Sequence, residues 1–195
     1  MNDRKQLWIL AGGNGAGKTT FYEKFLAPKQ VTFINADILA KSLDKNDTES
    51  VSYAAAKLAE KLRLDLLRKG QSFCFETVFS HPSKIDFLAE AKALDYEIIL
   101  IYIHLQTDEL NQARVDQRIK QGGHSVPAEK IISRIPRTKK NVQQALPLVD
   151  YAALYDNSSQ DQPFLTVALL TNGQLDIKVD LLPEWAEVML TNFLK

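Results

Sequence analysis

The stretch Gly12-Gly13-Asn14-Gly15-Ala16-Gly17-Lys18-Thr19 is a complete Gly-x-x-x-x-Gly-Lys-Thr phosphate-binding loop. It follows a short apolar run at residues 6–11 and precedes a segment whose apolar residues have helical spacing. Strand, glycine-rich loop and helix form the context that this motif requires. The glycines let successive backbone N–H groups point at phosphate oxygens, and the N-terminus of the helix adds to the attraction. We therefore predict that the loop binds a nucleoside triphosphate.

The motif also assigns roles to single side chains. We expect Lys18 to be exposed at the loop and to bring its positive charge to the β- and γ-phosphates, while the Thr19 hydroxyl binds Mg²⁺. The residues predicted to bind ATP are Gly12, Gly13, Asn14, Gly15, Ala16, Gly17, Lys18, Thr19 and Thr20.

The composition is that of an ordinary soluble globular protein. The chain has 195 residues, of which 45% are hydrophobic and 25% charged, and its formal net charge is zero. A balanced charge gives no general attraction to nucleic acids or acidic membranes, so a nucleic-acid partner is not expected. We expect one domain over residues 1–195 and a cytoplasmic protein, because the N-terminal apolar run leads straight into the loop and the longest apolar stretch, 98–103, is too short for a bilayer. The single cysteine, Cys74, excludes a disulfide within the chain.

Strand-like and helix-like segments alternate along the chain, which predicts an α/β fold with a doubly wound parallel sheet of the P-loop kinase type. The expected strands are residues 6–11, 31–34, 72–75, 97–104 and 152–155. The expected helices are 18–26, 48–69, 80–94 with Ser80 as its cap, 108–121, and one from 127 that is interrupted near Pro136 and Pro147.

The C-terminal extension, about residues 160–195, departs from this alternation. Residues 164–170 and 175–181 flank an Asn-Gly pair, which predicts a β-hairpin, and residues 183–194 predict a short final helix.

Polar residues at the ends of the predicted strands are candidates for chemistry, because ligands of open α/β sheets bind beyond the carboxyl ends of the strands. Asp37 is the candidate general base for an acceptor hydroxyl, and its alternative role is the N-cap of the turn that begins at Ile38. Glu76 follows an apolar run and is interpreted as a ligand for acceptor hydroxyls or, through water, for Mg²⁺; the alternative is a surface residue. Thr77 is a weaker substrate-binding candidate.

The segment from Arg114 to Lys140 holds eight Lys and Arg residues against two acids, a local charge of +6. It favours a lid over about residues 108–140 that closes on ATP, with a solvated helix face as the alternative. Arg118 and Arg134 are predicted to stabilise the transferred phosphoryl group, with Arg114 and Arg137 as further members of the group. Gly122-Gly123 would act as a hinge, and His124 could donate to a phosphate.

Four motifs, in their order along the chain, resemble those of the zeta toxin-like P-loop kinases. They are the phosphate loop, Asn35-Ala36-Asp37, Phe75-Glu76-Thr77-Val78 and residues 122–127. The resemblance is closest to a small stand-alone branch often labelled predicted ABC-type ATPases, although no apolar strand ends in the Asp-Glu pair that an ABC ATPase needs. It implies ATP and Mg²⁺ as cofactors and phosphorylation of a hydroxyl, which in zeta toxins belongs to UDP-N-acetylglucosamine. An antitoxin protein is an implied partner.

The resemblance also implies roles for individual positions. Asp37 matches the base, Glu76 a substrate-binding glutamate, and Arg118 the first lid arginine. The second lid arginine of the family has no clear match. When the chain is aligned on Val126-Pro127, His124 falls at that position, and Arg134 would have to take its place from further along the chain. Three functions stay open: a small-molecule kinase, a nucleotide-switched binding protein or toxin-like module that acts through a partner, and, encouraged only by the basic segment, a nucleic-acid kinase.

Overall fold

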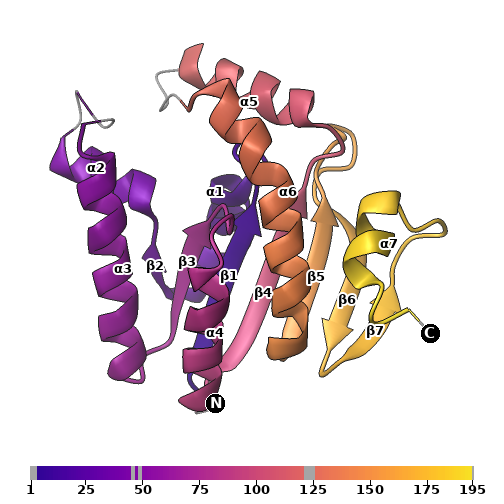
Figure 1. The fold of residues 1–195 in the computed structure, drawn as a ribbon, viewed down its shortest axis with the longest axis horizontal. Helices are drawn as coiled ribbons and strands as arrows, with labels where there is room; N and C mark the ends of the chain where they lie inside the picture. The colour runs from indigo at the N-terminus through magenta and orange to yellow at the C-terminus, as the bar shows by residue number, and fades with distance from the viewer. Residues whose placement is uncertain (1–3, 45–46, 48–49, 121–125, 195) are drawn as a thin grey trace.

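The computed structural model describes residues 4–44, 47, 50–120 and 126–194. Its centre is a seven-stranded sheet in the order β2-β3-β1-β4-β5-β6-β7, in which β1 to β5 pair in parallel and β6 and β7 are added antiparallel at one edge (Figure 1). The strands are β1 (Gln6–Gly12), β2 (Thr32–Ile34), β3 (Phe73–Thr77), β4 (Glu97–His104), β5 (Tyr151–Asp156), β6 (Leu165–Thr171) and β7 (Gln174–Ile177). The helices are α1 (Lys18–Phe21), α2 (Ala36–Leu43), α3 (Ser52–Arg68), α4 (Ser83–Ala93), α5 (Asp108–Lys120), α6 (Ala128–Ala145) and α7 (Glu184–Leu190).

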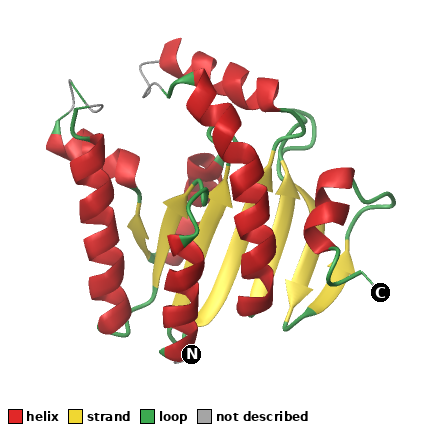
Figure 2. Cartoon of the chain, viewed as in Figure 1, coloured by secondary structure: helices red, strands yellow, loops and turns green. Residues whose placement is uncertain are grey.

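Helices cover both faces of the sheet. In Figure 2, α3, α4, α6 and α7 lie in front of the strands and α1 lies behind them, while α5 crosses above their carboxyl ends. The side chains of β4 alternate between the two faces: Leu100 and Tyr102 pack into the larger core, and Ile101 and Ile103 into the smaller core around Phe21 of α1. A strand buried on both faces explains why β4 is apolar almost throughout. No helix in the described ranges combines the length and the apolar character that crossing a membrane requires.

The predicted α/β alternation and the C-terminal hairpin are confirmed. Asn172 and Gly173 join β6 to β7 with φ values of +49° and +80°, which are the two positive angles of a type I′ turn. The second strand of the hairpin is shorter than predicted, and it ends at Ile177.

Two predicted helix starts are wrong. The helix expected from residue 48 begins at Ser52, and residues 48–49 lie outside the described ranges. Ser80 does not cap α4, because Pro82 occupies the N-cap position and the helix begins at Ser83.

The predicted interruption near Pro136 is also wrong, since α6 runs unbroken from Ala128 to Ala145. Proline removes one helical hydrogen bond, and its ring crowds the carbonyl four residues earlier, here that of Ile132. Together these effects destabilise a helix by about 3 kcal/mol. Both residues are exposed, so water reaches that carbonyl. The opposite face buries Ile131 and Ile135, and each contributes about 1.5–3 kcal/mol, which outweighs the loss.

Candidate active site

The phosphate-binding loop joins β1 to α1 at the carboxyl edge of the sheet and packs tightly against its neighbours. A Cβ atom at Gly12, where φ is +152°, would lie 2.4 Å from the Ile103 carbonyl oxygen of β4. A Cβ atom at Gly17, where φ is +95°, would lie 2.6 Å from Nδ2 of Asn157. Both positions therefore require glycine for conformation and for space.

Two asparagines from distant segments hold this loop, and sequence reasoning missed both. Asn111 of α5 donates from Nδ2 to the Asn14 carbonyl (2.6 Å), and Asn157, just after β5, donates from Nδ2 to the Ala16 carbonyl (2.9 Å). Asn157 also accepts the Phe164 N–H through Oδ1 (3.1 Å). The asparagine side chains thus satisfy loop carbonyls and leave the loop N–H groups available for phosphate oxygens.

Lys18 is buried rather than exposed, which corrects the sequence-based prediction. Only 6% of the residue is accessible, and Nζ donates to the Gly13 carbonyl (2.9 Å) and lies 3.7 Å from Oε1 of Glu76. Burial lowers the pKa of Lys18 below its usual value, and the carboxylates of Glu76 and Asp37 oppose that shift. A triphosphate entering the cleft would supply the additional negative charge that a buried ammonium group needs.

Glu76 lies against the phosphate-binding loop because β3 pairs with β1, which places it opposite Leu10. Its Oε2 accepts hydrogen bonds from Oγ1 of Thr19 (2.9 Å) and Nδ2 of Asn35 (2.8 Å). The interpretation of Glu76 as a surface residue is therefore wrong. The Thr19 hydroxyl and the Glu76 carboxylate are hard oxygen donors beside the loop, so they fit Mg²⁺, whose other ligands are usually phosphate oxygens and water.

Asp37 does not cap α2. The cap is Asn35, whose Oδ1 accepts the N–H groups of Asp37 (2.7 Å) and Ile38 (3.2 Å). Asp37 occupies the first turn of α2, is exposed, and lines the same cleft as Lys18. Because the capping role belongs to Asn35, the Asp37 carboxylate is available at the cleft for another role.

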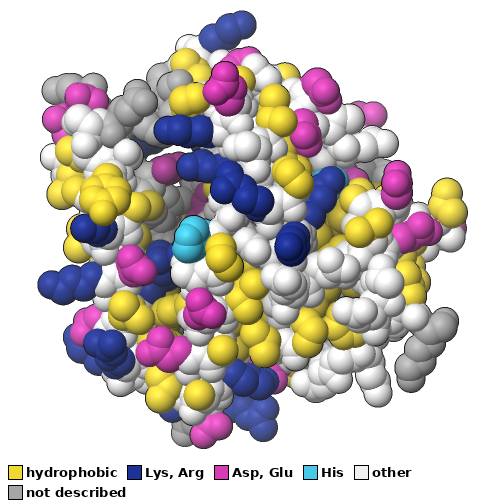
Figure 3. Space-filling view, in the orientation of Figure 1, with side chains coloured by type: hydrophobic (Ala, Val, Ile, Leu, Met, Phe, Trp, Pro, Cys, Tyr) yellow, Lys and Arg dark blue, Asp and Glu magenta, His cyan; other side chains and the backbone are white. Residues whose placement is uncertain are grey.

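A cleft of about 550 Å³ opens from the loop towards α3, α4 and α6. Figure 3 shows this hollow with Lys and Arg side chains along its rim. The cationic lining residues are Lys18, Lys57, Arg63, Lys84, Arg118, Lys130 and Arg134, and the acidic ones are Asp37, Glu60 and Glu76. The excess of positive charge suits a ligand that carries several negative charges.

Some of the predicted lid residues line the cleft and others do not. Arg118 of α5 and Arg134 of α6 line the cleft, as does Thr77 of β3. Arg137 does not line it, and its Nε donates to the Ser133 carbonyl on its own helix (3.0 Å).

Three further predicted residues are placed differently. Arg114 lies beside the phosphate-binding loop: a Cβ atom added at Gly15 would be 3.3 Å from the Cβ atom of Arg114. Thr20 is an exposed residue of α1 outside the cleft lining. His124 lies outside the described residues.

Comparison with known proteins identifies the family that the sequence motifs resemble. The family model named Zeta toxin matches residues 1–160. The chain is also 29% identical over 136 residues to an uncharacterized protein of Haemophilus influenzae, and the match covers 66% of this chain and 96% of that protein.

The fold is similar to solved structures of low sequence identity. A chain of the AvrRxo1-ORF1:AvrRxo1-ORF2 complex with sulphate ions superposes with a TM-score of 0.74 at 19% identity; the match covers 97% of this chain but 64% of the AvrRxo1 chain. A chain of the PezAT toxin–antitoxin system of Streptococcus pneumoniae gives a TM-score of 0.65 at 17% identity and covers 98% and 85%. With the loop, the strand order and the sequence match over residues 1–160 in agreement, this chain belongs to the zeta toxin family and has the fold of a P-loop kinase.

Proposed function

We propose that this protein is an ATP-dependent kinase that transfers the γ-phosphate of ATP to a hydroxyl group of a small acidic molecule. The observation that carries the proposal is that one cationic cleft contains both the buried Lys18 of the phosphate-binding loop and the Asp37 carboxylate. A structure of similar fold, the AvrRxo1-ORF1:-ORF2 complex with ATP, supports ATP as the nucleotide (TM-score 0.72, 19% identity).

Phosphoryl transfer depends on positioning and on neutralised charge more than on covalent chemistry by the protein. Loop N–H groups and Lys18 bind the β- and γ-phosphates. Thr19 and Glu76 would hold Mg²⁺, which when bound neutralises phosphate charge. Asp37 orients the acceptor hydroxyl and takes its proton as the new O–P bond forms and the bond between the γ-phosphorus and the ADP oxygen breaks.

The part of the cleft lined by Arg63 of α3 and Lys84 of α4 indicates an acidic acceptor. Arg63 is 8% exposed, and its guanidinium lies 5.1 Å from the centre of the Phe75 ring. Burial lowers the pKa of Lys84, and the neighbouring Arg63 lowers it further, while Glu60 opposes the shift. Two adjacent, largely desolvated cations favour a ligand that brings a phosphate or carboxylate. A UDP-sugar, as the family resemblance suggests, has this character.

Replacing Arg118 by alanine should lower the transfer rate at least ~10²-fold while ATP affinity changes much less, because a lid arginine stabilises charge mainly in the transition state. Rates under ATP saturation, together with ATP titration by calorimetry, measure the two quantities separately. We expect a comparable loss for only one of Arg134→Ala and His124→Ala, which identifies the second cation of the lid.

Arg137→Ala is the matched control for this experiment, because Arg137 lies on α6 outside the cleft. If Arg118, Arg134 and His124 can all be replaced with no more effect than Arg137, residues 108–140 are a solvated surface rather than a lid.

A second candidate function is a toxin-like protein that acts through a partner. The observation that favours it is that the similar structures named above come from complexes, a toxin–antitoxin system and a pair of AvrRxo1 chains. In such a protein, ATP would set the state of the binding surface without an acceptor.

An untargeted metabolite experiment tests the kinase proposal. The protein is incubated with a bacterial metabolite extract and ATP carrying a labelled γ-phosphate, and labelled products are separated by anion exchange and identified by mass. We expect one acidic compound to gain a phosphate, and no gain with the Asp37→Asn protein. If no compound is labelled although ATP binds, the partner-based function replaces the kinase.

A further inference from the structure

A second cavity, of about 710 Å³, lies between α6, α7 and strands β4 to β6. Among the described residues, it shares no lining residue with the phosphate-binding cleft. Helix α6 separates the two spaces, because Arg134 lines the cleft and Lys139 lines the second cavity. A volume of this size is typical of small-molecule sites.

His104, at the end of β4, places a neutral imidazole at this cavity. The residue is 4% exposed, and burial, with Lys139 nearby, lowers the pKa of His104 to about 4. Burial raises the pKa of Tyr102, so its hydroxyl keeps its proton. In the described part of the chain, that hydroxyl has Nδ1 of His104 as its hydrogen-bond partner (3.2 Å). We assign the hydroxyl as the donor and Nδ1 as the acceptor, because the hydroxyl has no other acceptor among the described residues, and this places the ring proton on Nε2.

Two buried donors at the cavity have no acceptor within the described residues: Nε2 of His104 and Nε1 of Trp185. Their rings lie against each other, with centroids 4.4 Å apart. A buried N–H group without a partner costs about 1–3 kcal/mol, and native proteins contain few of them. Two such donors on adjacent rings indicate a missing acceptor.

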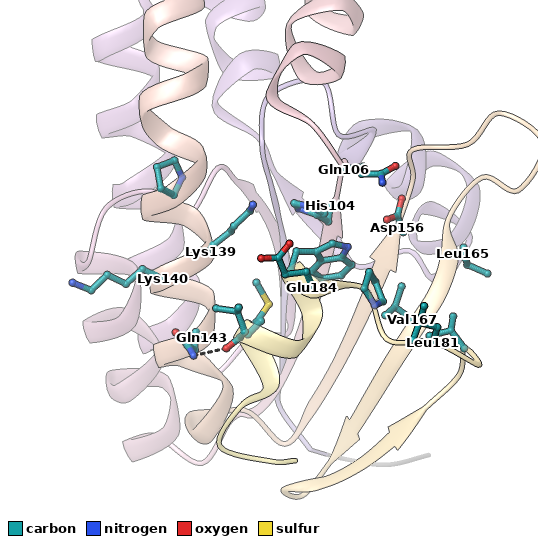
Figure 4. Close-up of a pocket in the computed structure, with 16 residues that line it drawn as sticks. His104, Gln106, Lys139, Lys140, Gln143, Asp156, Leu165, Val167, Leu181 and Glu184 are labelled. Atoms are coloured by element: carbon teal, nitrogen blue, oxygen red, sulfur yellow. Dashed lines mark hydrogen bonds between the residues drawn. The ribbon is translucent and has the colours of Figure 1, made fainter. Parts of the chain in front are cut away.

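Lys139 adds a positive charge to the same side of the cavity. Its side chain extends from α6 towards His104 (Figure 4), is half-buried, and forms no ion pair within 4 Å in the described ranges. Two carboxylates also line the cavity: Asp156, which accepts the Ser158 N–H (2.8 Å) and whose charge acts on His104, and Glu184, which is exposed on α7. Lys139 and Lys140 balance these two charges. Among the described residues that line the cavity, the buried nitrogen atoms without a hydrogen-bond partner are those of His104 and Trp185, so the cavity lacks an acceptor for two donors.

The other side of the cavity is apolar. Figure 4 shows Leu165, Val167 and Leu181 across the space from His104 and Lys139, and Val188 and Met189 of α7 continue this lining. Apolar side chains facing a cavity favour a hydrocarbon surface over water.

We propose that this cavity is a second ligand site, which binds a small amphipathic carboxylate. The carboxylate accepts hydrogen bonds from Nε2 of His104 and Nε1 of Trp185 and pairs with Lys139, and its apolar body lies against β6 and α7. Because the Trp185 ring covers the imidazole, binding displaces that ring and changes its fluorescence.

Octanoate is a suitable probe, since it has one carboxylate and an unbranched apolar chain. Trp8 and Trp185 are the two tryptophans, so a Trp8→Phe protein reports on Trp185 alone. We expect a saturable change in its emission with octanoate and a higher melting temperature. Octan-1-ol, which lacks the charge, and inorganic phosphate, which lacks the chain, should each bind at least ~10-fold more weakly.

Lys139→Met in the same background should weaken octanoate binding at least ~10-fold, whereas Arg137→Met, on the same helix but outside the cavity, should not. Val179→Phe, which fills the space from its lining, should also weaken it. Circular dichroism confirms that each variant is folded. Equal binding of octanoate by the two α6 variants, or of octan-1-ol and octanoate by the parent, overturns the proposal. Kinase activity is not part of the readout, so the result is independent of the acceptor.

Discussion

Lys18→Ala should abolish measurable phosphoryl transfer and weaken binding of Mg-ATP at least ~10²-fold. A hydrogen bond to a charged group contributes about 1.5–3 kcal/mol, and the loop motif assigns the Lys18 ammonium, which is buried here, to the β- and γ-phosphates. Isothermal titration calorimetry with Mg-ATP measures the affinity, and the labelled-phosphate assay measures transfer.

The control for this variant is Lys24→Ala, because Lys24 is an exposed lysine in the π-helical segment Tyr22–Leu26 that follows α1. Thermal unfolding is recorded as well, since removing Lys18 takes away the cation beside Glu76 and the donor to the Gly13 carbonyl. A folded Lys18→Ala protein with unchanged Mg-ATP affinity would contradict ATP binding at this loop.

Asp37→Asn should retain Mg-ATP binding but reduce transfer about 10³-fold, because an amide cannot accept the proton of the acceptor hydroxyl. The expected result is specific for catalysis, since Asn35 rather than Asp37 caps α2 and the substitution leaves the cap intact. Single-turnover transfer at saturating ATP measures the loss.

Asp95→Asn is the matched control, because Asp95 is an exposed aspartate after α4 and does not line the cleft. Asn35→Ala, in contrast, should lower the free energy of unfolding by about 1 kcal/mol through loss of the cap. If Asp37→Asn transfers phosphate at the parent rate, the carboxylate is not the base and another group must orient the acceptor.

The fold could be predicted because its signals are local. The glycines of residues 12–17, the apolar strand before them and the Asn-Gly pair at 172–173 each specify a backbone conformation within a few residues. The path of α6 through Pro136 could not be predicted locally, because the buried stripe that stabilises this helix depends on what the tertiary structure places beside it.

The identity of the main site residues could be predicted from the sequence, but their burial and hydrogen-bond partners could not. Asp37 and Glu76 were found because strand ends meet at one edge of a parallel sheet. The burial of Lys18 and the choice of Asn35 over Asp37 as the cap depend on distances between β1, β2 and β3 that no spacing in the sequence reports.

The second cavity had no signal in the sequence. His104 and Lys139 are 35 residues apart in the chain, and Trp185 lies in the C-terminal extension, for which the sequence predicts only a hairpin and a short helix. Asn111 in α5 and Asn157 just after β5 likewise gain their roles at the phosphate-binding loop only because packing brings their partners close.

Cys74, the single cysteine, is the second residue of β3 and has no accessible surface, and burial raises the pKa of its thiol well above the usual value. A buried neutral thiol reacts poorly with maleimides, because the thiolate is the nucleophile. The native cysteine should therefore take up little maleimide dye, so that cysteines introduced elsewhere can be labelled selectively. Cysteines placed at exposed positions such as Tyr53 of α3 and Ile132 of α6 would each take one dye, and energy transfer between the dyes would report the width of the phosphate-binding cleft, molecule by molecule, as nucleotide is added.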